Sequence, residues 1–354
     1  MGIEKNLDLN FFRNKRVLIT GHTGFKGSWL CEILYNAGSR ILGYALKPNS
    51  EKCLYSLCNL DKKVDSIIAD IRDINKLKET FDEFQPEIVI HMAAQPIVRE
   101  SYINPVYTYE TNVMGTVNVC ECIRLSSYVK SFLNVTTDKV YKNNEWEWGY
   151  RESDILDGFD PYSNSKSCSE LVTHSYINSF YGNMDVAVST ARAGNVIGGG
   201  DFADDRIIPD CFRAAINNEK IIVRNPNSIR PYQHVMESLY AYLIIVSRQY
   251  NDKTVSGFYN VGPDEKDCIT TGDMVSLFCK KWGDGLEWIN PPRTGPHEAN
   301  YLKLDCSRIK NVFKWKPRWD VETAVDKTVE WYKAYSDGND LTECMDKQIN
   351  EFFV

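Results

Sequence analysis

The chain has 354 residues and a formal net charge of −7, and its 43% hydrophobic and 25% charged residues are typical of a globular protein in water. The acidic balance and the dispersed Lys and Arg residues argue against a nucleic-acid partner, and no apolar run approaches the ~18 residues that a membrane helix needs. A chain of this length favours two lobes over a single core.

Short β-rich segments alternate with helical segments in the first half of the chain. Helices are predicted at 28–37, ending at Ala37-Gly38, and at 75–83, with Asp73 as the N-cap. Strands are predicted at 16–20, 40–45, 66–69, 87–91, 131–136 and 185–190. This alternation predicts an α/β fold of the Rossmann type. Its doubly wound parallel sheet carries helices on both faces and binds ligands at the carboxyl ends of the strands.

The alternation loosens beyond residue 191. A helix is predicted at 209–217, a short strand at 221–223, a long helix at 234–249 and a further sheet strand at 258–261. We therefore expect a dinucleotide-binding domain made of residues 1–191 and about 230–263. The segments at about 192–229 and 264–354 are expected to form a smaller mixed α/β lobe for the substrate.

The eleven cysteines are too few for a disulfide scaffold, which would need ~8–10% of the residues. No Cys-x-x-Cys pair and no Cys/His spacing suited to zinc occurs, so no metal site is expected. The first residues carry charges where a secretory signal needs an apolar segment. Reduced thiols and a cytoplasmic protein are the expectation.

A glycine-rich segment follows the first predicted strand. Its spacing is Gly-x-x-Gly-x-x-Gly, at Gly21, Gly24 and Gly27. These glycines permit a tight turn, a close approach of the backbone to a pyrophosphate, and close packing of the helix whose N-terminus faces the phosphates. The intervening residues are candidates for cofactor contacts, although a structural role for the first two is as probable on sequence alone: His22, Thr23, Phe25 and Lys26.

The residue that would bind the adenosine ribose is less clear. The second predicted strand ends without the acid that NAD enzymes often carry ~20 residues past the glycines, and Lys47 would suit a 2′-phosphate. NAD is preferred, and NADP stays the alternative. Asp70-Ile71 follows the third strand, where the acid can accept a hydrogen bond from adenine or cap a turn.

Small residues end the fourth predicted strand. Ala93 and Ala94 let the chain pass close to a flat ligand, and Gln95 follows them. Asn112 is expected to open a helix, where it either braces the sheet or caps the helix. All four residues are candidates for the cofactor site.

Tyr162 and Lys166 are four residues apart, so a helix places them on one face. A neighbouring ammonium and a positive nicotinamide would favour the phenolate of a base. Thr137, at the end of the fifth predicted strand, can hydrogen-bond the oxygen undergoing oxidation. Asp138 and Lys139 come next, as an acid for a leaving hydroxyl and a base for a carbon-bound proton. A surface pair and a loop ion pair are the plain alternatives for these two motifs.

Together these residues resemble the extended short-chain dehydrogenase/reductase family, and within it the nucleotide-sugar 4,6-dehydratases, over nearly the whole chain. The glycine and Tyr-Lys motifs specify only the large family. The stretches around Trp146, Asn195 and His297 are typical of the members that act on CDP-glucose. The segments that carry the resemblance are 20–28, 91–96, 111–116, 146–152, 160–166, 192–201, 230–235 and 297–305.

The resemblance implies a lyase of deoxysugar biosynthesis that acts on a nucleotide sugar. Oxidation at carbon 4 with NAD would precede elimination of water across carbons 5 and 6 and return of hydride to carbon 6. It implies that Asn195, Arg230 and His297 bind the substrate, with a turn amide and a lobe-bridging ion pair as plain alternatives for the first two. It further implies a homodimer or a dimer of dimers, paired through helices at about 112–125 and 162–180.

Two other readings stay open on the sequence. An epimerase or simple dehydrogenase of the same family would need Tyr162 but would give Asp138-Lys139 no task. Dehydratases of dTDP-glucose resemble the chain but carry Asp-Glu at those two positions. A non-catalytic nucleotide-binding regulator would have no use for Thr137, Tyr162 and Lys166 together.

Overall fold

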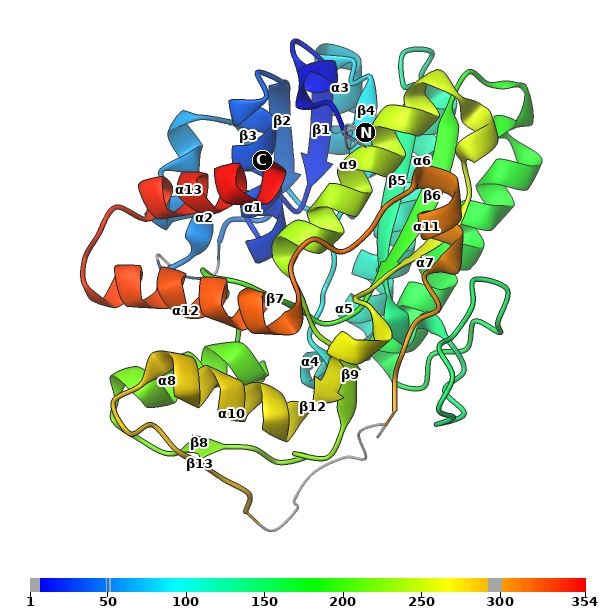
Figure 1. Cartoon of the computed structure of the whole chain (residues 1–354). Coiled ribbons are helices and arrows are strands. Elements are labelled where there is room, and N and C mark those ends of the chain that lie inside the picture. The colour runs from blue at the N-terminus through cyan, green and yellow to red at the C-terminus, as the bar shows by residue number, and fades with distance from the viewer. Residues whose placement is uncertain (1–6, 49, 51, 292–300) are drawn as a thin grey trace, which may run out of the picture.

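The computed structural model describes residues 7–48, 50, 52–291 and 301–354. Its centre is a sheet of seven parallel strands in the order β11-β6-β5-β4-β1-β2-β3, with helices on both faces (Figure 1). The strands are β1 (Arg16–Thr20), β2 (Arg40–Ala45), β3 (Asp65–Ile68), β4 (Ile88–His91), β5 (Ser131–Thr137), β6 (Ala187–Ala193) and β11 (Phe258–Val261). The predicted doubly wound α/β fold is confirmed.

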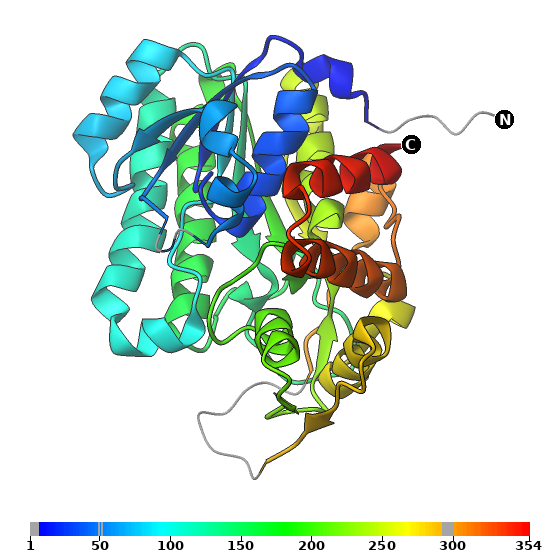
Figure 2. The ribbon, with the colours of Figure 1, turned by 90° about the vertical axis from the view of Figure 1, so that its left-hand side faces the viewer.

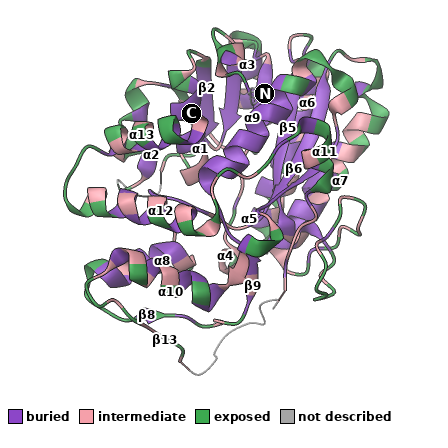
Figure 3. Ribbon diagram, in the orientation of Figure 1, coloured by how far each residue is buried: buried purple, intermediate pink, exposed green. Residues whose placement is uncertain are grey.

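Alternating side chains of the central strands supply two separate cores. Val17 and Ile19 of β1 belong to the larger core, whereas Leu18 belongs to the core on the opposite face. The helices that pack on the sheet are α1 (Phe25–Asn36) and α9 (Val235–Asn251) on the first face, and α3 (Ile74–Phe84), α6 (Gly115–Leu125) and α7 (Pro161–Ser179) on the second. Burial on both faces explains why these strands read as nearly continuous apolar runs. The central strands and α9 are buried along almost their whole length (Figure 3).

Side-chain caps fix several helix starts. The carboxylate of Asp73 accepts hydrogen bonds from the backbone N–H groups of Asn75 and Lys76, so this residue is the N-cap of α3 as predicted. Helix α1 begins three residues before the predicted position 28, because Gly24 serves as its N-cap. Strand β6 extends past the predicted end at residue 190, because it pairs with β5 in register as far as Thr137 and Ala193.

The second half of the chain adds a strand to the main sheet and also forms helices and strands outside it. Strand β11 pairs in parallel with β6, so the predicted sheet strand at 258–261 is confirmed. The remaining α-helices and strands of the whole chain are α2 (Leu54–Leu57), α4 (Val98–Ile103), α5 (Pro105–Tyr109), β7 (Val196–Ile197), α8 (Ile207–Ile216), β8 (Ile221–Ile222), β9 (Ile229–Pro231), β10 (Gln233–His234), β12 (Cys268–Thr270), α10 (Thr271–Trp282), β13 (Trp288–Ile289), α11 (Ser307–Phe313), α12 (Val321–Ser336) and α13 (Leu341–Phe353).

Helices α8 and α10 lie with their small sheets below the main sheet in both views (Figures 1 and 2). The pairs β10-β7, β12-β9 and β13-β8 are two-stranded. The eleven cysteines are free thiols. Within the described ranges, no helix is both long enough and apolar enough to cross a membrane.

Candidate active site

The turns after β1 and β4 touch where the strand order reverses. Gly21 has φ +78°, and a Cβ at this residue would lie 2.8 Å from the backbone nitrogen of Ala93. That nitrogen donates a hydrogen bond to Oγ1 of Thr20 at 3.1 Å. The first glycine thus lies against the small residues after β4, at the point where doubly wound sheets bind their ligands.

The first turn of α1 packs directly on the turn after β1. A Cβ on Gly27 would lie 2.2 Å from the carbonyl oxygen of Gly21, so no larger residue fits there. Gly24 caps the helix without a side-chain hydrogen bond, and the nearest atom to a Cβ at this residue would be 3.4 Å away. The helix N-terminus therefore has no side-chain cap, which leaves its first backbone N–H groups for an anion.

The side chains between these glycines point in different directions. His22 is buried, its Nε2 lies 2.7 Å from Oγ of Ser66, and its ring occupies the space that a Cβ on Gly43 would need. Burial lowers the pKa of His22 to about 4, so the ring is neutral. Oγ1 of Thr23 donates to the carbonyl of Leu46. Both side chains serve the structure, which leaves their backbone atoms for a ligand.

Asp70 caps the turn that follows β3. Its carboxylate accepts hydrogen bonds from the backbone and the guanidinium of Arg72, which lower the pKa of Asp70. The same guanidinium pairs with Glu110 at 2.7 Å. Ile71 is buried and lies against Gly115, where a Cβ would approach it to 2.8 Å. The turn-capping role is thus filled within the chain, and a contact of Asp70 with adenine stays a prediction.

Asn112 braces the chain after β4. Its Oδ1 accepts from the backbone nitrogen of Gln95 at 2.8 Å, and its Nδ2 donates to the Gln95 carbonyl and to Oγ of Ser165 on α7. Asn112 does not open a helix as the sequence suggested. It lies in a π-helical turn, Glu110–Met114, that joins α5 to α6 without a break. The bracing alternative is the one that the structure shows.

Tyr162 and Lys166 share a buried face of α7. The ammonium of Lys166 donates to the carbonyl of Val135 at 3.1 Å, and burial lowers the pKa of Lys166 to about 8 while Glu170 opposes this effect. Burial raises the pKa of Tyr162 to about 12, against the positive charge of Arg206 and the nearby Thr137 hydroxyl. In the chain alone, burial outweighs the positive charge of Arg206, and the expectation that Lys166 and a positive nicotinamide favour the phenolate stays a prediction.

Asp138 and Lys139 stand in a short 3-10 turn at the end of β5. Thr137 donates a hydrogen bond from Oγ1 to Oδ1 of Asp138 at 2.9 Å, whereas Oδ2 is buried without a hydrogen-bond partner among the described residues. Burial raises the pKa of Asp138, although Lys139, Thr137 and Arg230 act in the opposite direction. A buried carboxyl with a raised pKa and one unpaired oxygen is suited to proton transfer.

Two cations close to these groups extend the predicted site. Lys26, predicted only for the cofactor, lies at the start of α1, and its ammonium donates to the Tyr242 hydroxyl at 3.4 Å. Burial and the charges of Arg206 and Lys166 lower the pKa of Lys26 to about 7. Arg206, which caps α8, was missed because it follows an irregular loop with no periodic pattern. Its charge reaches both Tyr162 and Lys26.

Two of the three predicted substrate residues lie in the described part of the chain. The side chain of Arg230, on β9, is buried, and its charge acts on Asp138, so the two residues are neighbours. Asn195 lies between β6 and β7, half-buried, and its carbonyl accepts from the backbone nitrogen of Gln233. His297 lies outside the described residues.

Comparison with known proteins places this site in a family. A model of the GDP-mannose 4,6-dehydratase family matches residues 18–328. The chain belongs to this family. It is 46% identical to the CDP-glucose 4,6-dehydratase of Salmonella typhimurium over 98% of both chains, and 29% identical to a probable dTDP-glucose 4,6-dehydratase of Sinorhizobium fredii over 90% of this chain and 92% of that protein.

Solved structures of nucleotide-sugar enzymes share the fold. A UDP-glucose 4-epimerase from Stenotrophomonas maltophila, with bound NAD and formylated UDP-arabinopyranose, aligns with a TM-score of 0.81 at 20% identity over 92% of this chain and all of that one. A dTDP-glucose 4,6-dehydratase from Bacillus anthracis in complex with NAD aligns with a TM-score of 0.77 at 20% identity over 92% of this chain and 98% of that one.

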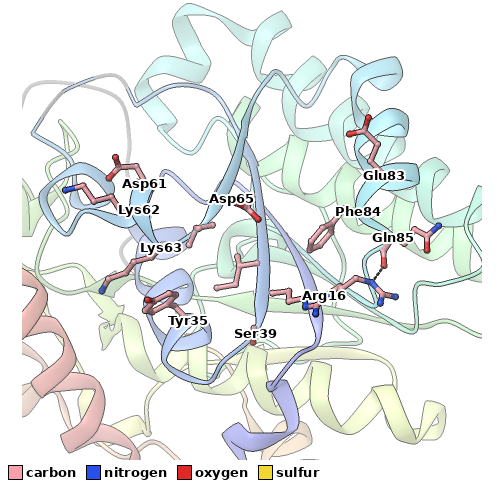
Figure 4. A pocket seen from close by; sticks show the side chains of 13 residues that line it. Arg16, Tyr35, Ser39, Asp61, Lys62, Lys63, Asp65, Glu83, Phe84 and Gln85 are labelled. Carbon is pink, nitrogen blue, oxygen red and sulfur yellow. Dashed lines mark hydrogen bonds between the residues drawn. The ribbon is translucent and has the colours of Figure 1, made fainter.

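A cavity of about 670 Å³ lies at the opposite end of the sheet (Figure 4). Arg16, Arg40 and Asp65 line it at the amino ends of β1, β2 and β3, far along the strands from Gly21 and Thr137. Lys62 and Lys63 approach it from one side and Glu83 from another. This cavity takes no part in the candidate site.

From the close packing of α1 we predict that a side chain at residue 27 destabilises the protein. Gly27→Ala should lower the free energy of unfolding by about 1–3 kcal/mol, because the new Cβ forces α1 away from the turn after β1. Gly182→Ala is the matched control, since its Cβ would meet no atom within 4 Å. Urea denaturation of both variants measures the difference. Equal stability of the two would contradict the close contact.

Proposed function

We propose that the protein is a CDP-glucose 4,6-dehydratase, a lyase that uses NAD to convert CDP-D-glucose to CDP-4-keto-6-deoxy-D-glucose. One observation carries the proposal: the turn at the end of β5 holds a buried acid, Asp138, followed by an amine, Lys139, and the charge of Asp138 acts on Tyr162. Identity of 46% over nearly the full length to a CDP-glucose 4,6-dehydratase supports the choice of nucleotide. An epimerase would leave Asp138 and Lys139 without a task.

The proposed NAD site is the crevice between β1 and β4. The N-terminus of α1, which has no side-chain cap, suits a pyrophosphate, and Gly21 lies in close contact with Ala93 at the switch point of the sheet. When bound, NAD supplies the acceptor and donor of hydride for the reaction. Gly21, Gly24 and Gly27 would hold the pyrophosphate, with Phe25 and Lys26 beside it.

Tyr162 acts first in the proposed cycle, as the base that takes the proton from the 4-hydroxyl. Its pKa of about 12 in the chain alone must fall when a positive nicotinamide comes close, because a neighbouring positive charge favours the phenolate. Arg206 already acts in that direction. Thr137 would donate a hydrogen bond to the oxygen undergoing oxidation in place of its bond to Oδ1 of Asp138.

Lys139 and Asp138 carry out the elimination in this proposal. The ketone at carbon 4 acidifies the carbon-5 proton, which Lys139 removes, while Asp138 protonates the leaving 6-hydroxyl. Burial raises the pKa of Asp138, which favours the protonated form that this step needs. The water-poor surroundings of the buried carboxyl strengthen its interactions with the substrate.

Two cations near the chemical site are candidates for binding the diphosphate. The charge of Arg230 acts on Asp138 and that of Arg206 on Tyr162, and a guanidinium suits a diphosphate through its fork of donors. Asn195 lies in the turn that joins the sheet to the lobe. His297 completes the set that resemblance suggests. Affinity for an anionic sugar nucleotide follows from this concentration of positive charge in a protein of net charge −7.

We also propose the two-part organisation expected from the sequence, with residues 1–191 and about 230–263 binding the cofactor and about 192–229 and 264–354 binding the substrate. The pairing of β11 with β6 supports the return of the chain to the first part. Helix α13 joins the two, since Asn36 donates a hydrogen bond to Asp346 at 2.7 Å. Cytoplasmic deoxysugar synthesis, as for a lipopolysaccharide O-antigen, would suit this enzyme.

Mass spectrometry of the products from a panel of nucleotide sugars with NAD tests the proposed function. CDP-glucose should lose one water and turn over faster than dTDP-, UDP- or GDP-sugars. Formation of a 4-epimer of unchanged mass would instead identify an epimerase. Binding without turnover of any member of the panel would identify a regulator.

Tyr162→Phe should lower kcat by about 100-fold or more, the scale of acid–base catalysis. The variant should keep its melting temperature and its affinity for NAD, because the ring stays in its buried place. Stopped-flow measurement of the first turnover separates this loss from product release. A fully active, folded variant would remove Tyr162 from the mechanism.

Lys139→Ala should slow the loss of the carbon-5 proton by about 100-fold or more while the first oxidation changes little. Substrate in heavy water should then exchange carbon 5 slowly, and a 4-keto-glucose nucleotide should accumulate. Lys142→Ala, an exposed neighbour three residues on, is the matched control. Normal product formation by the Lys139 variant would exclude Lys139 as the base.

A homodimer or a dimer of dimers is proposed, paired through α6 and α7. Exposed apolar side chains in this region are an argument for such an interface, among them Leu125, Leu171 and Phe180. Leu171→Arg should give monomers in multi-angle light scattering, whereas Val312→Arg, equally an exposed apolar residue on a helix, should not. A wild-type monomer at all micromolar concentrations would refute the assembly.

A further inference from the structure

An ion pair without any solvent contact lies behind the catalytic residues. Arg192 on β6 and Glu170 on α7 are both 0% exposed. The guanidinium donates from Nε to Oε1 at 2.9 Å and from Nη2 to Oε2 at 3.1 Å, so the pair is bidentate. Burial alone would raise the pKa of Glu170, but His174 and Arg192 outweigh it and lower the pKa to about 2. The pair therefore stays charged throughout the working pH range.

The carboxylate of Glu170 also ties α7 to the residue before the catalytic turn. Oγ1 of Thr136 donates to Oε1 at 2.5 Å, and Oγ1 of Thr190 donates to Oε2 at 2.8 Å. Thr136 is followed at once by Thr137, Asp138 and Lys139. Thr190 lies within β6, away from the catalytic turn.

The guanidinium of Arg192 ties the residue after that turn. Its Nη1 donates to the hydroxyl of Tyr141 at 2.7 Å and to the carbonyl of Glu152 at 3.1 Å. The Tyr141 hydroxyl in turn donates to Oδ1 of Asn260 on β11 at 2.6 Å. One ion pair thus bonds side chains on both flanks of the turn that carries Asp138 and Lys139, through Thr136 before it and Tyr141 behind it.

We propose that Glu170 and Arg192 are positioning residues that hold the Asp138-Lys139 turn in register with Tyr162 and Lys166 for the elimination. Glu170 stands one helical turn after Lys166 on α7, so the anchor and the Tyr-Lys pair belong to one rigid element. This inference rests on the proposed dehydratase function and assigns these two residues no contact with substrate.

Stability alone does not account for such a pair. Burying two charges is expensive, and replacing a buried ion pair by apolar residues of similar volume is often neutral or stabilising. The planar fork of Arg fixes the angles to its partners, which an apolar contact does not. A misplacement of a catalytic group by about 1 Å can lower the rate about 100-fold. The directional hydrogen bonds of the pair therefore act by holding the catalytic turn in position.

Two threonines on the same carboxylate provide a matched test. Thr136→Val and Thr190→Val each remove one buried hydroxyl from Glu170 and preserve the side-chain shape. We expect Thr136→Val to lower kcat at least about 10-fold with KM nearly unchanged, and Thr190→Val to lower it no more than about 2-fold. Carbon-5 exchange in heavy water should slow in the first variant only. Equal losses in the two variants would overturn the proposal.

The double variant Glu170→Leu/Arg192→Met separates positioning from stability. Its melting temperature should equal or exceed that of the wild type, yet kcat should fall about 10- to 100-fold. Wild-type kcat in a stable double variant would overturn the proposal, and if this variant fails to fold, the threonine comparison decides. If the proposed dehydratase function itself is wrong, the wild-type enzyme will give a product other than a 4-keto-6-deoxy sugar, so the two failures can be told apart.

Discussion

The contact between α1 and the turn after β1 is the constraint on which the site depends. Because Gly27 carries no side chain, the helix reaches the carbonyl of Gly21, and its N-terminus has no side-chain cap. The same approach brings Lys26 beside Tyr242, within reach of the charges of Lys166 and Arg206. One backbone contact thus positions both the proposed pyrophosphate-binding turn and part of the chemical site.

Burial shifts the pKa values of the ionisable groups at the chemical site. Desolvation raises the pKa of Asp138 and Tyr162 and lowers that of Lys26 and Lys166. The pKa values of the acids and of the bases therefore lie closer together, which lowers the free-energy cost of proton transfer between them. The bidentate pair of Glu170 is the exception, since its partners keep it ionised. We interpret it as the fixed support behind groups whose protonation changes.

The sequence predicted the parts of the fold that depend on local pattern. Strands β1, β2 and β11 match the predicted limits because each is a short, mostly buried run bounded by turns. The end of β6 was missed because pairing with β5 decides it. At the site, the glycine turn and the Tyr-Lys face were predictable from spacing. The contact of His22 with Ser66, the bracing by Asn112 and the approach of Arg206 depend on tertiary packing that no local pattern encodes.

The fate of a label on carbon 4 tests the central claim most directly. CDP-glucose deuterated at carbon 4, incubated with the wild-type enzyme and NAD, should give CDP-4-keto-6-deoxyglucose with the deuterium at carbon 6, because oxidation and reduction act on the same sugar. In heavy water, unlabelled substrate should gain deuterium at carbon 5. Deuterium that leaves on released cofactor, without loss of water from the sugar, would contradict the account.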